Sequence, residues 1–398
     1  MTQDSPSHSL VIVGNGPGEV AGWALPVAAE ARRLARAWGR PMEISLCLPP
    51  CQFASGQEPA AAAAAAVFDH IFDPRATFKL SLGLPGWAPA GQPVVLHVGG
   101  DFWYTRRLAR RWRARAFAFV ERAHVARVHR AFDGIFVPTV ALQERLVDRG
   151  VPAAKIAVTG DPRFDAVVMQ SAHVEASGGN GARPKVTFLA GSRDTVFSAI
   201  FPFWVRTASA LRVQLPDARL VAVISPFVSP ALHRSLIARH REALDAARIE
   251  VGYGGWPHVV GSDLALTIPG TNTLELAIMR IPSMVVLPFS IAPQIPFEGL
   301  IEWIARVPYV GPKLRLHLAR RYVRRIPYVA LPNMRAGRRI MPELIGDVTP
   351  EQVAAESARL IRDEGARAAL IEALEALPLE RGASGRLLEA MRPAWGIG

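Results

Sequence analysis

Several features that mark other protein classes are missing or scarce in this 398-residue sequence. The only cysteines are Cys47 and Cys51, which excludes a disulfide framework and predicts a reducing, cytoplasmic compartment. Their Cys-x-x-x-Cys spacing has no second ligand pair, so we expect two ordinary thiols rather than a zinc site. No uninterrupted apolar run reaches the roughly 18 residues that a membrane helix requires, and residues 1–9 show no secretory signal.

Lysine is also rare, and the only four among the 46 basic residues are Lys79, Lys155, Lys185 and Lys313. Arginine therefore carries the formal net charge of +12, and this excess indicates an anionic partner or surface. We find no zinc finger, no RNP-type aromatic pattern and no clear helix-turn-helix, so we expect no nucleic acid partner. Phosphate-bearing small molecules and an anionic membrane surface explain the charge as well.

Short apolar strands alternate with helical segments, a pattern that predicts doubly wound, largely parallel α/β sheets. We expect strands at 10–13, 43–48, 94–98, 134–137, 156–158, 186–189, 219–224, 264–268 and 284–287. We expect helices at 22–38, 116–131, 140–149, 197–215, 273–279, 350–363 and 366–377. The sequence therefore predicts two Rossmann-like domains that face each other across a cleft, with C-terminal helices.

The predicted domain boundaries follow from a segment rich in Gly, Ser and Ala that interrupts the pattern. We place the N-terminal domain at 1–172, the linker at 173–184 and the C-terminal domain at 185–348. Residues 349–398 are expected to form helices that pack back across the domains. Ligands are expected at the carboxyl ends of the strands, where the loops converge.

Two loops of the first half carry carboxylates. The loop from Gly14 to Glu19 lacks the dinucleotide-binding spacing, because Gly18 comes one residue early and Glu19 takes the expected place of a glycine. It either forms a wall of the cleft, with Glu19 directed at a substrate, or is a tight chain reversal. In the second loop, Asp101 is either a general base for an attacking hydroxyl group or the N-cap of the following helix.

Two loops of the second half offer what a phosphate group needs. Gly191-Ser192-Arg193 provides backbone amides and a guanidinium, although a capped helix with an exposed arginine is the structural alternative. The segment from Gly270 to Thr273 presents the N–H groups and positive dipole end of a helix, and Glu275 is placed to accept ribose hydroxyls. A well-capped helix is the alternative there. No Asp-x-Asp triplet indicates a metal-held nucleotide sugar, and we interpret the histidines as structural, with His97 the only one near a predicted site.

The order and spacing of these motifs from about residue 10 to 365 resemble the lipid-A-disaccharide synthase family. The motifs are Gly18-Glu19 with Gly22, Asp101-Phe102, Gly191-Ser192-Arg193, Gly270-Thr271-Asn272-Thr273-Leu274-Glu275, Leu331-Pro332-Asn333 with Ala336-Gly337-Arg338, and Pro342-Glu343-Leu344. The sequence departs from the family's Gly-Glu-x-Ser-Gly-Asp, because Ala21 and Trp23 replace Ser and Asp. The family's tryptophan-rich stretch is not recognisable around 116–130.

The resemblance implies a GT-B fold and metal-independent, inverting transfer of a sugar, of the N-acetylglucosamine type, from a UDP-sugar to a lipid-linked acceptor in lipid A biosynthesis. It implies no cofactor and no metal. Residues carried over to UDP-sugar binding are Gly191, Ser192, Arg193, Gly270, Thr271, Asn272, Thr273, Glu275, Asn333, Arg338 and Glu343. Asp101 and Glu19 would be catalytic, and Gly16, Gly18 and Gly100 would line the acceptor side.

Two other functions stay open on the same fold: a UDP-sugar 2-epimerase, and a non-catalytic nucleotide-sugar-binding or scaffold protein. The lost Ser and Asp of the first loop motivate the second of these. We also expect peripheral attachment to the inner face of the cell membrane, because apolar and aromatic residues at 295–309 precede clustered cations at 313–325. Helices packed on the core with a solvated basic face are the alternative. The oligomeric state is not determined by the sequence.

Overall fold

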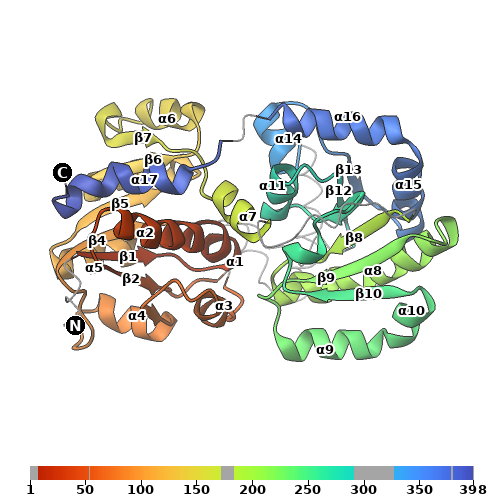
Figure 1. Cartoon of the computed structure of the whole chain (residues 1–398), viewed down its shortest axis with the longest axis horizontal. Coiled ribbons are helices and arrows are strands. Elements are labelled where there is room, and N and C mark those ends of the chain that lie inside the picture. The colour runs from red at the N-terminus through yellow and green to blue at the C-terminus, as the bar shows by residue number, and fades with distance from the viewer. Residues whose placement is uncertain (1–7, 53, 172–182, 291–326, 378–379, 398) are drawn as a thin grey trace, which may run out of the picture. The chain divides into compact units, whose positions relative to one another are not determined.

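A computed structural model describes residues 8–52, 54–171, 183–290, 327–377 and 380–397 (Figure 1). The chain divides into unit 1, Met1–Met169 with Glu380–Gly398, and unit 2, Gln170–Leu379. The last segment of the chain thus belongs to unit 1, whereas the helices before it belong to unit 2. Of the predicted linker at 173–184, only residues 183 and 184 are described. Each unit contains one parallel sheet, which confirms the predicted α/β class.

Unit 1 is built on a seven-stranded sheet in the order β3-β2-β1-β4-β5-β6-β7. Its strands are β1 (His8–Val13), β2 (Met42–Cys47), β3 (His70–Phe72), β4 (Gln92–His97), β5 (Arg115–Phe119), β6 (Gly134–Val137) and β7 (Ile156–Val158). Its α-helices are α1 (Pro17–Glu19), α2 (Leu25–Ala37), α3 (Glu58–Ala64), α4 (Pro74–Ser81), α5 (Phe102–Trp112), α6 (Val140–Val147), α7 (Arg163–Ser171) and α17 (Ala383–Met391). A π-helical turn, Val20–Ala24, lies between α1 and α2.

Unit 2 is built on a six-stranded sheet in the order β10-β9-β8-β11-β12-β13. Its strands are β8 (Lys185–Leu189), β9 (Arg219–Ile224), β10 (Ile249–Tyr253), β11 (Leu264–Thr267), β12 (Ser283–Pro288) and β13 (Glu343–Gly346). Its described α-helices are α8 (Asp194–Gln214), α9 (Pro230–Arg239), α10 (Arg241–Ala246), α11 (Thr271–Ile278), α14 (Leu331–Ala336), α15 (Pro350–Arg362) and α16 (Glu364–Glu375).

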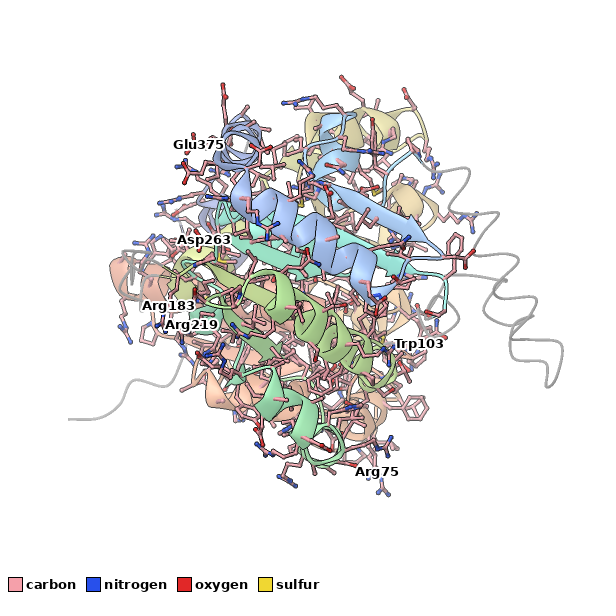
Figure 2. All side chains as sticks on the ribbon, turned by 90° about the vertical axis from the view of Figure 1, so that its right-hand side faces the viewer. Arg75, Trp103, Arg183, Arg219, Asp263 and Glu375 are labelled. Carbon is pink, nitrogen blue, oxygen red and sulfur yellow. The ribbon has the colours of Figure 1, made fainter. Side chains whose placement is uncertain are left out.

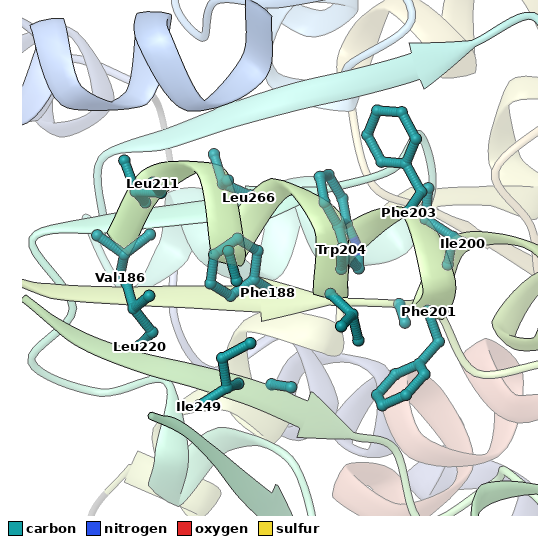
Figure 3. Close-up of a cluster of buried hydrophobic side chains, with 14 of the residues drawn as sticks. Val186, Phe188, Ile200, Phe201, Phe203, Trp204, Leu211, Leu220, Ile249 and Leu266 are labelled. Atoms are coloured by element: carbon teal, nitrogen blue, oxygen red, sulfur yellow. The ribbon is translucent and has the colours of Figure 1, made fainter. Parts of the chain in front are cut away.

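Both faces of the sheet in unit 2 are covered by helices. Along β9, Leu220 and Ala222 belong to one buried cluster, and Val221 and Val223 belong to another. The first cluster includes Phe188 of β8 and Trp204 of α8, and the centroids of these two rings are 5.9 Å apart (Figure 3). The central strands are therefore apolar on both sides, as is typical of parallel sheets between helix layers.

The prediction of a helix at 116–131 is wrong. This segment begins with strand β5 and continues into short 3-10 turns at Ala123–Arg127 and His129–Ala131. Its alanines favour a helix, but Phe117 and Phe119 alternate with them at the period of a strand. Pairing with β4 and β6 on both sides provides the hydrogen bonds and burial that outweigh local helix propensity.

The predicted membrane-facing segments at 295–309 and 313–325 lie outside the described residues. Within the part of the chain that the structure describes, no helix combines the length and the apolar character needed to span a bilayer.

Candidate functional site

In each sheet the strand order reverses at one point, and the predicted loops lie at those points. In unit 1 the reversal falls between β1 and β4, and in unit 2 between β8 and β11. The connections after such neighbouring strands run to opposite sides, which opens a crevice at the carboxyl ends of the strands. The loops of Glu19 and Asp101 follow β1 and β4, and those of Arg193 and Gly270 follow β8 and β11.

In unit 2 the loops after β8 and β11 are in contact. A Cβ atom added to Gly191 would lie 3.1 Å from Cδ1 of Ile268 and 3.2 Å from Cγ1 of Val196, and the φ of Gly191 is +82°. Both observations explain why glycine stands there. Ser192 follows in the same loop, and Arg193 is the N-cap of the 21-residue helix α8. Arg193 therefore lies at the positive end of a long helix dipole.

The loop after β11 leads into the N-terminus of α11. Gly270 is the N-cap, with φ of +154° and no atom within 4 Å of an added Cβ. Thr271 and Asn272 follow as half-buried residues, and their N–H groups belong to the first turn, where a helix has no internal partners. Glu275, which is 9% exposed, lies one turn further on. Two helix N-termini and an arginine thus come from neighbouring strands, an arrangement that suits a diphosphate.

Thr273 has a structural role that the sequence did not reveal. Its hydroxyl donates to the Gly270 carbonyl oxygen at 2.8 Å and accepts a hydrogen bond from the backbone N–H of Leu331 at 3.1 Å. The residue is fully buried. Thr273 therefore joins the start of α11 to the start of α14, and does not present its hydroxyl to a ligand.

Asn333 also differs from its predicted role as a nucleotide contact. It is fully buried, and its Oδ1 accepts from the backbone N–H groups of Ile340 at 2.7 Å and Met341 at 2.8 Å. Its Nδ2 donates to the Met341 carbonyl oxygen and to Oε1 of Glu343, each at 2.8 Å. All four of its hydrogen-bonding positions are used within the chain, so Asn333 stabilises the loop 337–342.

Glu343 is the first residue of β13 and shares this network. Its Oε1 accepts from the backbone N–H groups of Val329 at 3.0 Å and Ala330 at 2.8 Å, besides Nδ2 of Asn333. Arg338 lies exposed in the loop that Asn333 holds. Of the three predicted site residues Asn333, Arg338 and Glu343, Arg338 is therefore the exposed one.

In unit 1 the carboxylate of Glu19 lies against the loop after β4. Its Oε2 accepts from the backbone N–H of Asn15 at 2.9 Å, and a Cβ on Gly99 would lie 2.1 Å from the carboxyl group. Glycine at 99 is therefore required for this contact. Gly16, with φ of +125°, and Gly18 complete the turn. That Glu19 is directed at a ligand stays a prediction, and the two predicted loops meet at its carboxylate.

Asp101 caps helix α5. Its Oδ1 accepts from the backbone N–H of Trp103 at 2.8 Å, and the residue is exposed. Gly100 precedes it with φ of +80°, and an added Cβ there would lie 3.0 Å from Cγ of Pro49. Burial, and after it the negative charge of Asp101, raises the pKa of the Tyr104 phenol. Asp101 is thus the N-cap that the sequence offers as the alternative to a general base. The cap uses Oδ1 only, so it is compatible with catalysis by Oδ2.

His97, the last residue of β4, is buried and neutral. Burial, with a smaller contribution from His124, lowers its pKa to about 3. Its Nδ1 lies 2.9 Å from Oγ1 of Thr105, and its ring packs on Phe102 with centroids 4.3 Å apart. A histidine that does not titrate near pH 7 is unsuited to proton transfer. His97 therefore has a structural role, in contact with Phe102 and Thr105 of α5.

The described residues contain no group of three or more His, Cys, Asp or Glu side chains that could hold a metal ion. Burial raises the pKa of the Cys47 thiol to about 12. A thiol binds metals as the thiolate, so Cys47 is a poor ligand. Metal-independent chemistry stays a prediction.

Residues that sequence reasoning missed gather at the same edge of unit 1. Trp23 contacts both Asp161 and Arg163, although Asp161 lies 138 residues further along the chain and Arg163 lies two residues beyond it. The only local signal was the strand end at Gly160-Asp161, since the partner Trp23 comes from a different loop. Asn15 was missed as well, and its Nδ2 donates to the Pro49 carbonyl oxygen at 2.6 Å.

Comparisons with known proteins agree with the motif pattern. A family model described as lipid-A-disaccharide synthetase matches residues 158–313. A lipid-A-disaccharide synthase of Anaeromyxobacter dehalogenans strain 2CP-C is 30% identical over 309 residues, which cover 77% of this chain and 70% of that protein. The enzyme of strain 2CP-1 is 32% identical over 228 residues, which cover 57% of this chain and 52% of that protein. The match thus spans about half the length of the second relative.

Among solved structures, UDP-GlcNAc 2-epimerase from Neisseria meningitidis bound to UDP-GlcNAc aligns with a TM-score of 0.57 at 12% identity, covering 97% of this chain and all of that chain. This likeness shows the fold. Together with two parallel-sheet units, the matches define a two-unit α/β protein with a GT-B-like fold. The chain belongs to the lipid-A-disaccharide synthase family.

Proposed function

We propose that this protein is an inverting glycosyltransferase that moves a sugar of the N-acetylglucosamine type from a UDP-sugar to a lipid-linked acceptor. The observation that carries the proposal is the contact between the Gly191 and Ile268 loops, where the strand order of unit 2 reverses. This contact brings together the loops that lead into α8 and α11, and Arg193 is the N-cap of α8. Relatives that are lipid-A-disaccharide synthases support the same activity.

The donor would be held by unit 2. The backbone at Gly191, Ser192 and Gly270 approaches the diphosphate, and Arg193 supplies a positive charge to it. Thr271 and Asn272 contribute N–H groups of the first turn of α11. Glu275 accepts hydrogen bonds from the ribose hydroxyls. Thr273, Asn333 and Glu343 act indirectly, because they hold the loops that contain Arg338 and the start of α11.

The acceptor would be activated by unit 1. Asp101 removes the proton from the acceptor hydroxyl as its oxygen attacks the anomeric carbon, and UDP leaves from the opposite face. The cap bond at Oδ1 fixes the orientation of Asp101, so Oδ2 receives the proton. Glu19, with Gly16, Gly18 and Gly100, lines the acceptor side. No step in this scheme passes through a metal or another cofactor.

Attachment to the inner face of the cell membrane is a further part of the proposal. The net charge of +12 supports it, and so does α5, which carries the exposed Arg106, Arg107 and Arg110 beside Trp103. Trp103 is 38% exposed, and the guanidinium of Arg107 lies 5.9 Å from its ring. Cations beside an aromatic ring suit an anionic lipid interface.

Calorimetric titration with UDP, UDP-N-acetylglucosamine and UDP-glucose tests the donor site. We expect binding by the native protein and about 10- to 100-fold weaker binding by Arg193→Ala, because a charge-assisted contact is lost. Arg219→Ala is the matched control, since Arg219 lies with Arg183 and Asp263 at the opposite edge of the same sheet and pairs with Glu250 at 2.8 Å (Figure 2).

Three other outcomes would change the conclusion. Unchanged affinity in Arg193→Ala would reject the phosphate assignment. No binding of any of the three ligands by folded protein would reject the donor and favour a scaffold. A C2 epimer that forms from UDP-N-acetylglucosamine in the absence of an acceptor, detected by NMR, would favour an epimerase.

A further inference from the structure

Trp23 lies half-buried in the π-helical turn Val20–Ala24, directly after Glu19 at the carboxyl edge of unit 1's sheet. We propose that the exposed surface of its indole ring stacks on the sugar ring of the lipid-linked acceptor, and thereby selects acceptors. The inference rests on the proposed function, because that function supplies a sugar-bearing acceptor. It assigns a specificity-determining residue that the motif pattern does not predict.

Three contacts fix the inner side of the indole ring. Its Nε1 donates to Oδ1 of Asp161 at 3.1 Å, and the guanidinium carbon of Arg163 lies 5.1 Å from the ring centroid. The edge of the ring meets Phe119, at the end of β5, with centroids 5.3 Å apart and an interplanar angle of 61°. A ring held on three sides loses little conformational entropy when a ligand stacks on the remaining surface.

The support beneath Trp23 is an ion cluster. Arg163 is fully buried and Asp161 is 1% exposed, and their side chains are joined by contacts that include Nη2 to Oδ2 at 2.7 Å. Glu121, just after β5, forms a second ion pair with Nη2 of Arg163. Gly22 allows this packing, because an added Cβ would lie 2.5 Å from Cγ of Arg163.

This cluster is better explained by function than by stability. Burying charges is expensive, and a buried ion pair often stabilises a fold no more than apolar residues of the same size. A π-helical turn is also rare and is frequently found at functional sites. Here both features serve to place one aromatic ring in the turn that follows Glu19, at the edge where ligands of parallel sheets bind.

The identity of residue 23 changes the chemistry of this edge. The family pattern that the sequence resembles has Asp at the position of Trp23 and Ser at the position of Ala21. Their replacement removes a carboxylate and a hydroxyl and adds a large apolar ring. The acceptor side is thus suited to the apolar face of a pyranose ring.

The experiment measures binding of n-octyl N-acetyl-β-D-glucosaminide, a sugar ring on one alkyl chain, to the full-length protein by saturation-transfer NMR. Trp23→Phe keeps an aromatic ring and Trp23→Leu does not, whereas both lose the bond to Asp161. We expect Trp23→Phe to bind within about threefold of the native protein and Trp23→Leu about tenfold more weakly.

A matched control exists in the same unit. Trp38 at the end of α2 is also half-buried and lies over a guanidinium, that of Arg392, at 5.6 Å. Trp38→Leu should bind the glucosaminide like the native protein. Loss of binding in Trp38→Leu equal to that in Trp23→Leu would show a non-specific effect and overturn the proposal.

Two further results would overturn the inference: native protein that does not bind the glucosaminide, or Trp23→Phe and Trp23→Leu that bind equally. UDP titration of the same samples separates this inference from the proposed donor function. If UDP does not bind but Trp23→Phe and Trp23→Leu differ as expected, the donor assignment fails and the stacking role of Trp23 stands. If UDP binds and Trp23→Phe and Trp23→Leu bind the glucosaminide equally, only the stacking role of Trp23 fails.

Discussion

Asp165 of α7 caps helix α17, more than 200 residues further along the chain. Its Oδ1 accepts from the backbone N–H of Gly382 at 2.6 Å, and its Oδ2 accepts from that of Ser384 at 2.7 Å. Gly382 is the N-cap of α17 and has no side chain of its own to satisfy these groups. Since the chain leaves unit 1 after Met169 and returns at Glu380, this carboxylate joins the segment that departs to the segment that comes back.

Asp165→Ala should destabilise unit 1 by about 1–2 kcal/mol, because a cap and a favourable charge at the positive end of α17 are both lost. Urea unfolding followed by circular dichroism measures this change. Asp148→Ala is the control, since Asp148 is exposed at the C-terminal end of α6, where a negative charge is unfavourable. Equal stability of Asp165→Ala and the native protein would show that the contact contributes nothing.

Asn333→Ala should cost about 2–4 kcal/mol of stability, because it leaves the N–H groups of Ile340 and Met341 buried without partners. The comparison is Asn272→Ala, which alters a half-buried residue at the start of α11 and should change stability by less than about 0.5 kcal/mol. UDP affinity should stay close to native in Asn272→Ala, because the variant keeps the backbone N–H that the proposal assigns to the diphosphate. A stable Asn333→Ala protein would contradict the structural role of Asn333.

Asp101→Asn separates the two roles of Asp101. Asparagine caps helices as well as aspartate does, so unfolding and UDP affinity should stay close to native. An amide does not accept the proton of the acceptor hydroxyl, so turnover should fall by about 10²- to 10⁴-fold. Normal sugar transfer by Asp101→Asn would remove this residue from the mechanism, whereas Asp101→Ala alone would confuse a lost cap with a lost base.

Stability should fall as the pH drops below about 6.5, because of His97. Its pKa is about 3 in the folded protein but ordinary in the unfolded chain. Between these values only the unfolded chain binds the proton, so stability decreases towards acid by up to about 1.4 kcal/mol per pH unit. Above pH 6.5 both states are neutral and the effect disappears.

Denaturant unfolding of native protein and His97→Gln between pH 4 and 8 tests this linkage. The variant should show a shallower pH dependence, but some slope should persist, because burial also lowers the pKa of the neighbouring His124. An identical pH slope in both proteins would show that His97 does not carry the linkage.

The sequence predicted the local elements well where an apolar run lies between clear turn residues. Strands β6, β7 and β9 have the predicted bounds, 134–137, 156–158 and 219–224. The segment 116–131 failed, because its alanines carry a helix signal that pairing with two neighbouring strands overrides. β3, β10 and β13 were missed, since a His, Glu or Gly interrupts or begins each of these short strands and weakens the apolar signal.

The same division applies to the candidate site. Gly191, Gly270 and Gly100 could be recognised from the sequence, because a turn from strand to helix needs backbone conformations that glycine adopts most easily. The partners of Asn333, Thr273 and Trp23 could not, because a side-chain hydrogen bond depends on which loops the sheet order brings together.

The sequence by itself determined two parallel α/β units, the four loops at the strand ends and the family to which the chain belongs, since all of these follow from local periodicity and short motifs. Only the tertiary structure decided that Asn333 stabilises a loop, that Asp165 caps a distant helix, and that Trp23 rests on a buried arginine. Such contacts join residues that are far apart in the chain, and the free energy that selects them comes from packing and hydrogen bonding between elements rather than within them.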